Sequence, residues 1–142
     1  MATSESGVNK VKYDAGGSGD NYIPSGEYGG QVRSIYDTFE CSGITTGSTI
    51  ALPTIPNASK VIGIYLAWDA LGSSSTIALG DALSSGRYAA AAASTSAGTN
   101  SAIALTGLNY EIGTTATDNV PLVTITAGTS INGTVSVVIF YV

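Results

Sequence analysis

The middle of the chain alternates apolar and polar residues with the two-residue period of a β-strand. Residues 60–81 read KVIGIYLAWDALGSSSTIALGD. One side of an extended backbone would collect four large apolar residues in this segment, Ile62, Ile64, Leu66 and Trp68. Residues 76–79 repeat the alternation after a Ser-rich turn. We therefore interpret residues 60–81 as a central hairpin whose apolar face needs a second layer to cover it.

Other β-forming segments follow one another at a spacing of about ten residues, with turn residues between them. They are residues 32–39, 48–52, 86–93, 101–105, 108–112, 120–127 and 134–142. Short strands at this spacing predict an all-β fold, a two-sheet β-sandwich of jelly-roll type. We place this domain at residues 32–142 and an extended N-terminal arm at residues 1–31.

Several of these segments carry a more specific signal. Residues 32–39 alternate imperfectly, which favours a sheet edge. Residues 86–93, GRYAAAAA, are expected to form a strand, with a helical turn as the alternative because of their alanine content. Residues 101–112 indicate a hairpin or a bulged strand pair. Asn132-Gly133 is a turn-forming pair before residues 134–142, TVSVVIFYV, which predict a strand buried on both faces.

Residues 1–31 differ from the rest of the chain. Glycines interrupt this segment and no period of 2 or 3.6 residues persists in it, yet it carries single apolar and aromatic residues. A segment of this kind is typical of an arm that docks onto another protein or along its own subunit. The alternative is a flexible leader whose tyrosines make no contacts. The predicted protein-binding residues of the arm are Val8, Val11, Tyr13, Tyr22, Ile23 and Tyr28.

Charge is low and unevenly distributed. The formal net charge is −5, which argues against a phosphate backbone as the partner and therefore against nucleic acid. Nine charged residues lie in the first 40 positions, and only six lie in the remaining 102, where Ser and Thr number 28. A domain this poor in ions has either a neutral, hydroxyl-covered surface or an exterior that packs against other subunits, because hydroxyls are cheaper to desolvate than ions.

Candidate chemistry is scarce. Histidine is absent and there is one cysteine, Cys41, so the usual catalytic triads and zinc sites lack their residues. We therefore expect no catalytic residue, no cofactor and no metal, with a small buried hydrophobe as the role of Cys41. Asp14, Asp20 and Asn21 could together hold calcium, although a solvated turn is the default interpretation.

Four further features have structural interpretations. Asp69 and Asp81 are expected to cap turns by accepting backbone N–H groups, because they close the two ends of the predicted hairpin. Arg87, beside Tyr88, is expected to pair its cation with a ring face or with an acid of a neighbour. Asn57-Ala58-Ser59 and Asn132-Gly133-Thr134 match the glycosylation sequon. The first residues lack the basic start and apolar run of a secretory signal, so we expect synthesis in a host cytoplasm, no membrane association and accidental sequons.

Three stretches carry a resemblance to a known group of proteins. They are LPTIPNASKVIGIYLAWDALGSSSTIALGD at residues 52–81, GRYAAAAASTSAG at residues 86–98 and NGTVSVVIFYV at residues 132–142. Together they resemble small structural proteins of tailed bacteriophage virions, over roughly residues 48–142. That resemblance implies a component that decorates or cements the capsid, or that lies at the neck or tail.

The leading hypothesis is a non-enzymatic capsid decoration or cement protein located in the virion. Its partners would be the major capsid protein or other virion proteins, and copies of itself, with a trimer favoured. A tail, neck or head-fibre component is the alternative. A carbohydrate-binding sandwich that uses Trp68 or exposed tyrosines is a remote one, because Trp68 shares its face with core residues. An enzyme ranks last.

Overall fold

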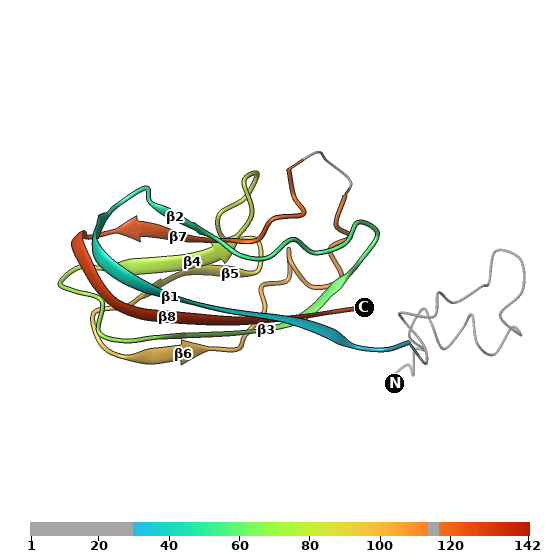
Figure 1. The fold of residues 1–142 in the computed structure, drawn as a ribbon, viewed down its shortest axis with the longest axis horizontal. Helices are drawn as coiled ribbons and strands as arrows, with labels where there is room; N and C mark the ends of the chain where they lie inside the picture. Colours follow the sequence, from blue (N-terminus) through green and yellow to red (C-terminus); the bar gives the residue numbers. More distant parts are fainter. Residues whose placement is uncertain (1–29, 114–116) are drawn as a thin grey trace, which may run out of the picture. The chain divides into compact units, whose positions relative to one another are not determined.

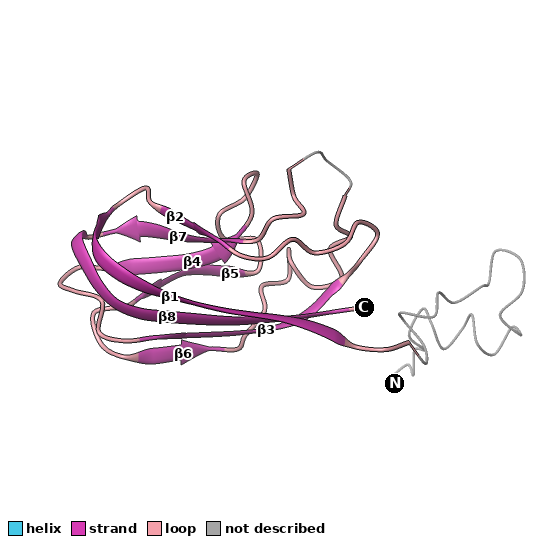
Figure 2. Cartoon of the chain, in the orientation of Figure 1, coloured by secondary structure: helices cyan, strands magenta, loops and turns pink. Residues whose placement is uncertain are grey.

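The computed structural model describes residues 30–113 and 117–142, and within them one compact unit spans Arg33–Tyr141. All regular secondary structure in this unit is β-strand, arranged in two layers (Figures 1 and 2). The strands are β1 (Arg33–Thr45), β2 (Thr49–Ala51), β3 (Val61–Trp68), β4 (Thr76–Gly80), β5 (Ala89–Ala93), β6 (Gly98–Asn100), β7 (Leu122–Ala127) and β8 (Thr129–Tyr141). The predicted all-β, two-sheet sandwich is confirmed.

The two sheets have four strands each, in the orders β1-β8-β3-β6 and β2-β7-β4-β5. All pairings are antiparallel, and they are nested along the chain: β1 pairs with β8, β2 with β7, β3 with β6, and β4 with β5. Eight strands in two sheets is also the content of a jelly roll, and the nested order is compatible with that narrower expectation.

The core lies between the two sheets, because each strand turns every second side chain inward. β3 and β8 contribute most of one side of the core, and β4 and β7 most of the other. The buried residues of these four strands include Ile64, Leu66, Trp68, Ile77, Leu79, Val123, Ile125, Val135, Val137 and Ile139. The outer face of the β1-β8-β3-β6 sheet is thereby left to half-buried and exposed side chains.

The predicted central hairpin is wrong. β3 and β4 belong to different sheets: β3 pairs with β6 and β8, and β4 pairs with β5 and β7. Residues 69–75 therefore cross from one layer to the other. The alternation predicted for β4, and for β3 from Ile64 to Trp68, is correct, but the two apolar faces meet across the core and do not form one continuous sheet face.

A bulge also shifts the predicted inner face of β3. The register with β8 changes between Val61 and Gly63, so one extra residue is accommodated there. Val61 is fully buried as a result, while Ile62, which the alternation placed inside, is only half-buried. From Ile64 to Trp68 the predicted inner face is confirmed.

Two further predictions are also corrected: the strand pair at residues 101–112 and the turn at Asn132-Gly133. Residues 101–112 form turns, because the Ala104 carbonyl accepts the N–H groups of Gly107 and Leu108 at 2.9 and 3.1 Å. β8 starts before the predicted turn, so Asn132 and Gly133 lie within the strand. The link from β7 to β8 is the single residue Gly128, with φ near +115°.

β8 is not buried on both faces. Its inner residues Val135, Val137 and Ile139 are almost fully buried, but the outward Val138 is half-buried and Phe140 is 38% exposed. Two other predictions are confirmed. β1 is an edge strand, although it continues to Thr45, and residues 89–93 form a strand, β5, and not a helical turn.

Candidate interaction surface

The outer face of the β1-β8-β3-β6 sheet carries a row of exposed apolar side chains. In the register of the sheet, Val138 of β8 pairs with Tyr36 of β1 on one side and with Tyr65 of β3 on the other. Tyr36 is 64% exposed and Tyr65 is 45% exposed. These rings stand on the outer face because their neighbours at odd spacing, such as Ile64, fill the core.

Phe140 extends this row toward the end of β8. It pairs with Ser34 on β1 and with Gly63 on β3. Gly63 leaves room for the aromatic ring, since a Cβ at this position would lie 3.4 Å from Phe140 Cδ2. We call Tyr36, Val138, Tyr65 and Phe140 the aromatic ridge.

A row of small residues runs beside the ridge. Thr38 and Ala67 lie two residues after Tyr36 and Tyr65, and both pair with Ser136, two residues before Val138. The hydroxyls of Thr38 and Ser136 are hydrogen-bonded to each other at 3.0 Å, so part of their polarity is already satisfied. An open hollow of about 500 Å³ lies at this row, lined mostly by small residues and also by a tryptophan and an acid: Ala67, Trp68, Asp69, Ala97, Gly98, Thr99, Thr134 and Ser136. We call this hollow the small-residue groove.

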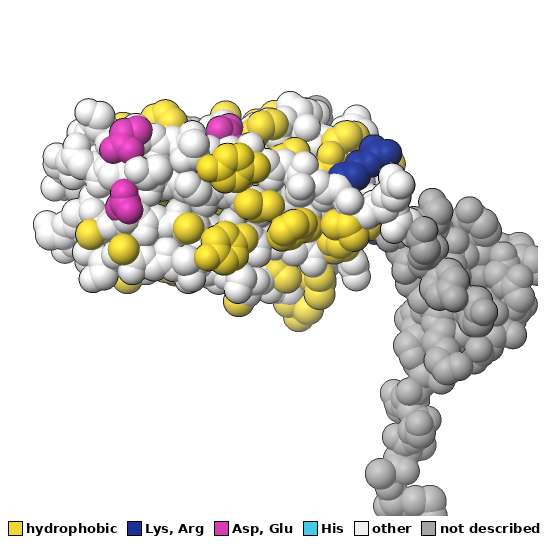
Figure 3. Space-filling view, turned by 60° about the horizontal axis from the view of Figure 1, so that its bottom comes forward, with side chains coloured by type: hydrophobic (Ala, Val, Ile, Leu, Met, Phe, Trp, Pro, Cys, Tyr) yellow, Lys and Arg dark blue, Asp and Glu magenta, His cyan; other side chains and the backbone are white. Residues whose placement is uncertain are grey.

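One end of this face is acidic, and a basic residue begins β1 beyond the other end. Next to the groove, Thr134 donates its hydroxyl to Glu40 Oε2 at 2.6 Å and its N–H to Asp69 Oδ2 at 3.0 Å. Both acids are exposed. Arg33, also exposed, begins β1 at the opposite end, where it pairs with the buried Tyr141 and follows the inward alternation of β1. Figure 3 shows hydrophobic side chains across the middle of this side of the molecule, acidic side chains at one end and a basic group at the other.

These features suit the face for binding protein. Scattered exposed hydrophobic residues are normal, whereas an ordered group of aromatic side chains with a polar rim is typical of an interaction site. Tyr and Phe gain the most from burial, and the hydroxyls around them can form hydrogen bonds again across an interface.

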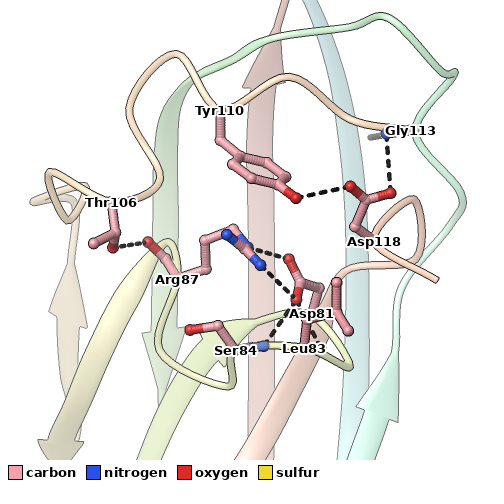
Figure 4. A network of polar contacts seen from close by, with 8 residues as sticks. All are labelled: Asp81, Leu83, Ser84, Arg87, Thr106, Tyr110, Gly113 and Asp118. Atoms are coloured by element: carbon pink, nitrogen blue, oxygen red, sulfur yellow. Dashed lines mark hydrogen bonds and ion pairs between the residues drawn. The ribbon is translucent and has the colours of Figure 1, made fainter. Parts of the chain in front are cut away.

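A second candidate is the polar network around Asp81 and Arg87 at one end of the sandwich (Figure 4). Asp81 follows β4 and is buried, and its Oδ1 accepts the N–H groups of Leu83 and Ser84, both at 2.9 Å. Arg87 donates Nε to Asp81 Oδ2 in an ion pair. The predicted turn-capping role of Asp81 is thus confirmed.

Arg87 also joins this network to the loop at residues 101–113. Its guanidinium carbon lies 3.9 Å from the centroid of the Tyr110 ring. Tyr110 donates its hydroxyl to Asp118 Oδ2 at 2.8 Å, and Gly113 donates its N–H to Asp118 Oδ1 at 2.9 Å. The sequence predicted a ring face or an acid for Arg87, and the structure provides both.

The network has the properties of a structural clamp. Burial lowers the pKa of Arg87, but the hydrogen bond and charge of Asp81 outweigh this effect, so the pKa is raised and the side chain stays cationic. Burial raises the pKa of the Tyr88 hydroxyl well above its ordinary value, and the charge of Asp81 adds to the shift. Both carboxylates are used to hold backbone and side-chain donors, which fixes the loop against β4 and β5.

The other candidate residues are placed as follows. Cys41 is buried, as predicted, and burial raises the pKa of its thiol, with a smaller contribution from Glu40. Trp68 is buried and donates Nε1 to the Ser96 carbonyl at 3.0 Å, so its ring is part of the core. The six predicted residues of the arm and the calcium candidates Asp14, Asp20 and Asn21 lie outside the described residues.

Metal and membrane sites were also considered. Among the residues that the structure describes, no group of three or more His, Cys, Asp or Glu side chains could hold a metal ion. The same part of the chain contains no helix long and apolar enough to cross a bilayer.

Sequence reasoning missed the aromatic ridge. Tyr65 was placed on the face of β3 opposite Ile64, which is correct, but Val138 and Phe140 were assigned to a strand buried on both sides. The available signal was the alternation of large and small residues in β8, where Ser136 and Thr134 share a face with Val138.

Comparison with known proteins finds solved structures with a similar fold. No protein-family model matches this sequence, and no curated protein matches it. Among solved structures, a chain of the cyanophage Pam1 capsid asymmetric unit is similar, with a TM-score of 0.64 and 26% identity over 84% of this chain and 89% of that chain. A chain of the capsid of Ralstonia phage GP4 has a TM-score of 0.62 and 19% identity over 80% of this chain and 84% of that chain.

Both structures are phage capsids. The resemblance to virion structural proteins of bacteriophages, predicted from the sequence, is therefore confirmed, and so is the predicted location in the virion. The GP4 comparison, at 19% identity, supports the fold alone. Both alignments cover more than the 95 or so residues of the sequence-level resemblance, since they extend over at least 80% of this chain.

Proposed function

We propose that this protein is a non-enzymatic decoration or cement protein of a phage capsid. It binds the capsid surface and adds contact area between neighbouring capsid subunits, with residues 1–31 as the attaching arm and the sandwich as the body that contacts other copies. The observation that carries the proposal is the similarity to a chain of the Pam1 capsid over 84% of this sequence.

The surface of the sandwich supports this role. Its exposed aromatic ridge is costly to leave in water, and the hydroxyls around the ridge are inexpensive to bury against protein. The polar network at Asp81 is occupied by structural hydrogen bonds, so it offers no free acid-base pair for catalysis. The major capsid protein and copies of this chain are the proposed partners, with a trimer as the proposed assembly.

The experiment is a binding assay with purified protein and capsids that lack it. We expect saturable binding, with a fixed number of copies per capsid, seen by sedimentation with the particles. Cryo-electron microscopy of the decorated particle should place the sandwich on the outer capsid surface. Absence of binding to capsids, or density confined to another structure, would overturn the decoration role.

The role of the arm needs its own variants. Replacing Tyr13, Tyr22 and Tyr28 with Ser in the full-length chain should lower capsid occupancy by about tenfold or more, because aromatic anchors dominate such contacts. Deletion of residues 2–30 should abolish binding, while circular dichroism checks that the sandwich still folds. The matched control is Leu105→Ser, which alters an 88% exposed apolar residue of the body. Unchanged occupancy in both arm variants would contradict the role of the arm.

A tail, neck or head-fibre component is the second candidate, and the same images distinguish it by the position of the density. The carbohydrate-binding alternative loses its main candidate residue because the Trp68 ring is buried in the core. A glycan array on the folded protein, with exposed Tyr36 and Tyr65 as the remaining platforms, would test it.

A further inference from the structure

β1 is a long open edge of the β1-β8-β3-β6 sheet (Figure 1). It has 13 residues and, within the described part of the chain, pairs with β8 alone. The other edge strands are short, with three residues each in β2 and β6 and five in β5. An unpaired row of backbone N–H and C=O groups is a template for the strand of another molecule, and a short edge limits such pairing. Among the described strands, β1 is therefore the edge that needs a further safeguard.

One hydrogen bond shows which backbone groups of β1 face away from β8. The Thr38 N–H group donates to Asp37 Oδ1 at 2.8 Å, so it is not used in the ladder with β8. Opposite residues in an antiparallel pair alternate between those that exchange backbone hydrogen bonds and those that do not. The N–H and C=O groups of Tyr36, Thr38 and Glu40 are therefore directed at the open edge, where a further strand would bind.

Asp37 lies in the middle of this edge, on the inner face of the sheet. It pairs with Val137, which is buried in the core. Its side chain lines a small hollow between the two sheets, together with Thr38, Phe39, Ile50, Leu52, Val123, Val135 and Val137. Asp37 is half-buried there, because the facing edge strand β2 is short and leaves this margin of the sandwich open. A carboxylate thus occupies a position whose neighbours are mostly apolar.

We infer that Asp37 prevents a further strand from pairing with β1, and so keeps copies of this protein from joining edge to edge. An added strand would take the Thr38 N–H group from Asp37 and would cover the open margin of the sandwich. The carboxylate would then be buried without a partner, which is strongly unfavourable. An inward-pointing charge on an edge strand is a recognised safeguard of β-proteins against such pairing.

The two ends of β1 are limited in other ways. Near its end the register with β8 shifts on both sides of Ile44, and Gly43 has a φ near +66°. Such bulges twist an edge away from a straight partner strand. At its start, Arg33 follows the same inward alternation as Asp37. Arg33 of one copy can lie opposite Asp37 of another only in an antiparallel pairing confined to residues 33–37 of β1, so the regular middle of the strand depends on Asp37.

The test uses purified full-length protein in sedimentation velocity over a range of concentrations. Asp37→Val should form larger species at concentrations about a hundredfold lower than the wild type, because no charge is buried when its edges pair. Infrared spectroscopy should show added intermolecular strand in these species. Asp37→Asn keeps an acceptor for the Thr38 N–H group but has no charge, so its association should lie between that of the wild type and that of Asp37→Val.

Two further variants show whether the association uses the edge of β1. Glu40→Val removes an exposed acid from the outer face of the same strand and should behave as the wild type. Asp37→Val with Thr38→Pro removes the backbone donor at the open edge and should restore wild-type behaviour. Circular dichroism checks that each variant folds.

Three results would overturn the inference: an Asp37→Val variant that stays at the wild-type assembly state, equal association by Glu40→Val, or association that survives Thr38→Pro. A wild type that associates and loses this association on Asp37→Val would assign Asp37 the opposite role. The inference goes beyond the proposed function and does not depend on it, because the association is measured without capsids. Failure of capsid binding would overturn the decoration role alone.

Discussion

Asp81 is the residue on which the end of the sandwich depends. Its carboxylate accepts two backbone N–H groups and pairs with Arg87, and its side chain is fully buried. Asp81→Ala removes all these contacts and leaves the Arg87 charge without its acid. We expect a loss of about 3 kcal/mol in the free energy of unfolding, measured in urea.

The matched control for this change is Asp69→Ala. Asp69 also accepts a backbone N–H group, from Thr134, but it is exposed. We expect a loss of about 1 kcal/mol or less for this variant. Equal losses at both positions would contradict the clamp role of the Asp81 network.

Tyr88 differs from Asp81 in that its buried polar group has no hydrogen bond among the described residues. Its ring is fully buried in the core. Burying an unsatisfied hydroxyl costs about 1–3 kcal/mol, so Tyr88→Phe should raise the unfolding free energy by about 1 kcal/mol at neutral pH. A destabilised Phe variant would show that the hydroxyl has a partner.

The same residue predicts a pH dependence. The pKa of Tyr88 is raised in the folded protein, so above the ordinary tyrosine pKa of about 10 the unfolded chain releases a proton that the folded chain retains. The free energy of unfolding is therefore unaffected by this ionisation below about pH 10, and it falls as the pH rises further because only the unfolded chain ionises. Tyr88→Phe should have a shallower loss of stability between about pH 10 and 11.5 than the wild type, measured by denaturant titration.

At the scale of elements, alternation identified the strands but not their partners. The inner faces of β4 and, from Ile64 to Trp68, of β3 were predicted correctly, because burial of alternate residues is local information. The pairing of β3 with β8 and of β4 with β7 joins segments far apart in the chain, and no local pattern records it. A short link between two strands was consequently read as a hairpin, although it crosses between sheets.

The Asn132-Gly133 error has a related cause. This pair favours turns, but the chain had already turned at Gly128, which no hairpin motif marks. Gly133 keeps a positive φ, near +120°, inside β8. Of the candidate site, the sequence could therefore indicate an exterior poor in ions and an outward Tyr65, but not the row that Tyr65 forms with residues of β1 and β8.

Gly128 provides a prediction for the link between β7 and β8. A Cβ at this position would overlap Ile131 Cδ1 and lie 3.3 Å from the Ser75 Cα, in addition to the strain of a φ near +115°. Gly128→Ala should lower the unfolding free energy by about 2–4 kcal/mol. Gly47→Ala is the matched control, because Gly47 has a φ near +89° but no atom within 4 Å of the added Cβ, and it should cost about 1 kcal/mol. Similar losses for both would show that packing around Gly128 is unimportant.

For the whole molecule, the proposed role predicts a concentration-dependent stabilisation of capsids. A protein that binds the assembled capsid and not its dissociated subunits stabilises it by mass action, by about 2.7 kcal/mol per site at one hundred times the Kd. We expect the melting temperature of undecorated capsids to rise continuously as purified protein is added, measured by scanning calorimetry.

The control for this titration is the protein with Tyr13, Tyr22 and Tyr28 replaced by Ser. It should need about tenfold more protein for the same shift in melting temperature. A shift that is independent of protein concentration would contradict stabilisation by binding.

The burial of the Cys41 thiol has a practical consequence. The thiol is 2% exposed, and its raised pKa keeps it protonated at neutral pH, so thiol reagents should leave it unmodified in the folded protein. The natural chain is thus ready for selective labelling at a single introduced cysteine, without prior removal of its own. A nitroxide at that introduced cysteine would then report the spacing between neighbouring copies on the capsid by dipolar spectroscopy.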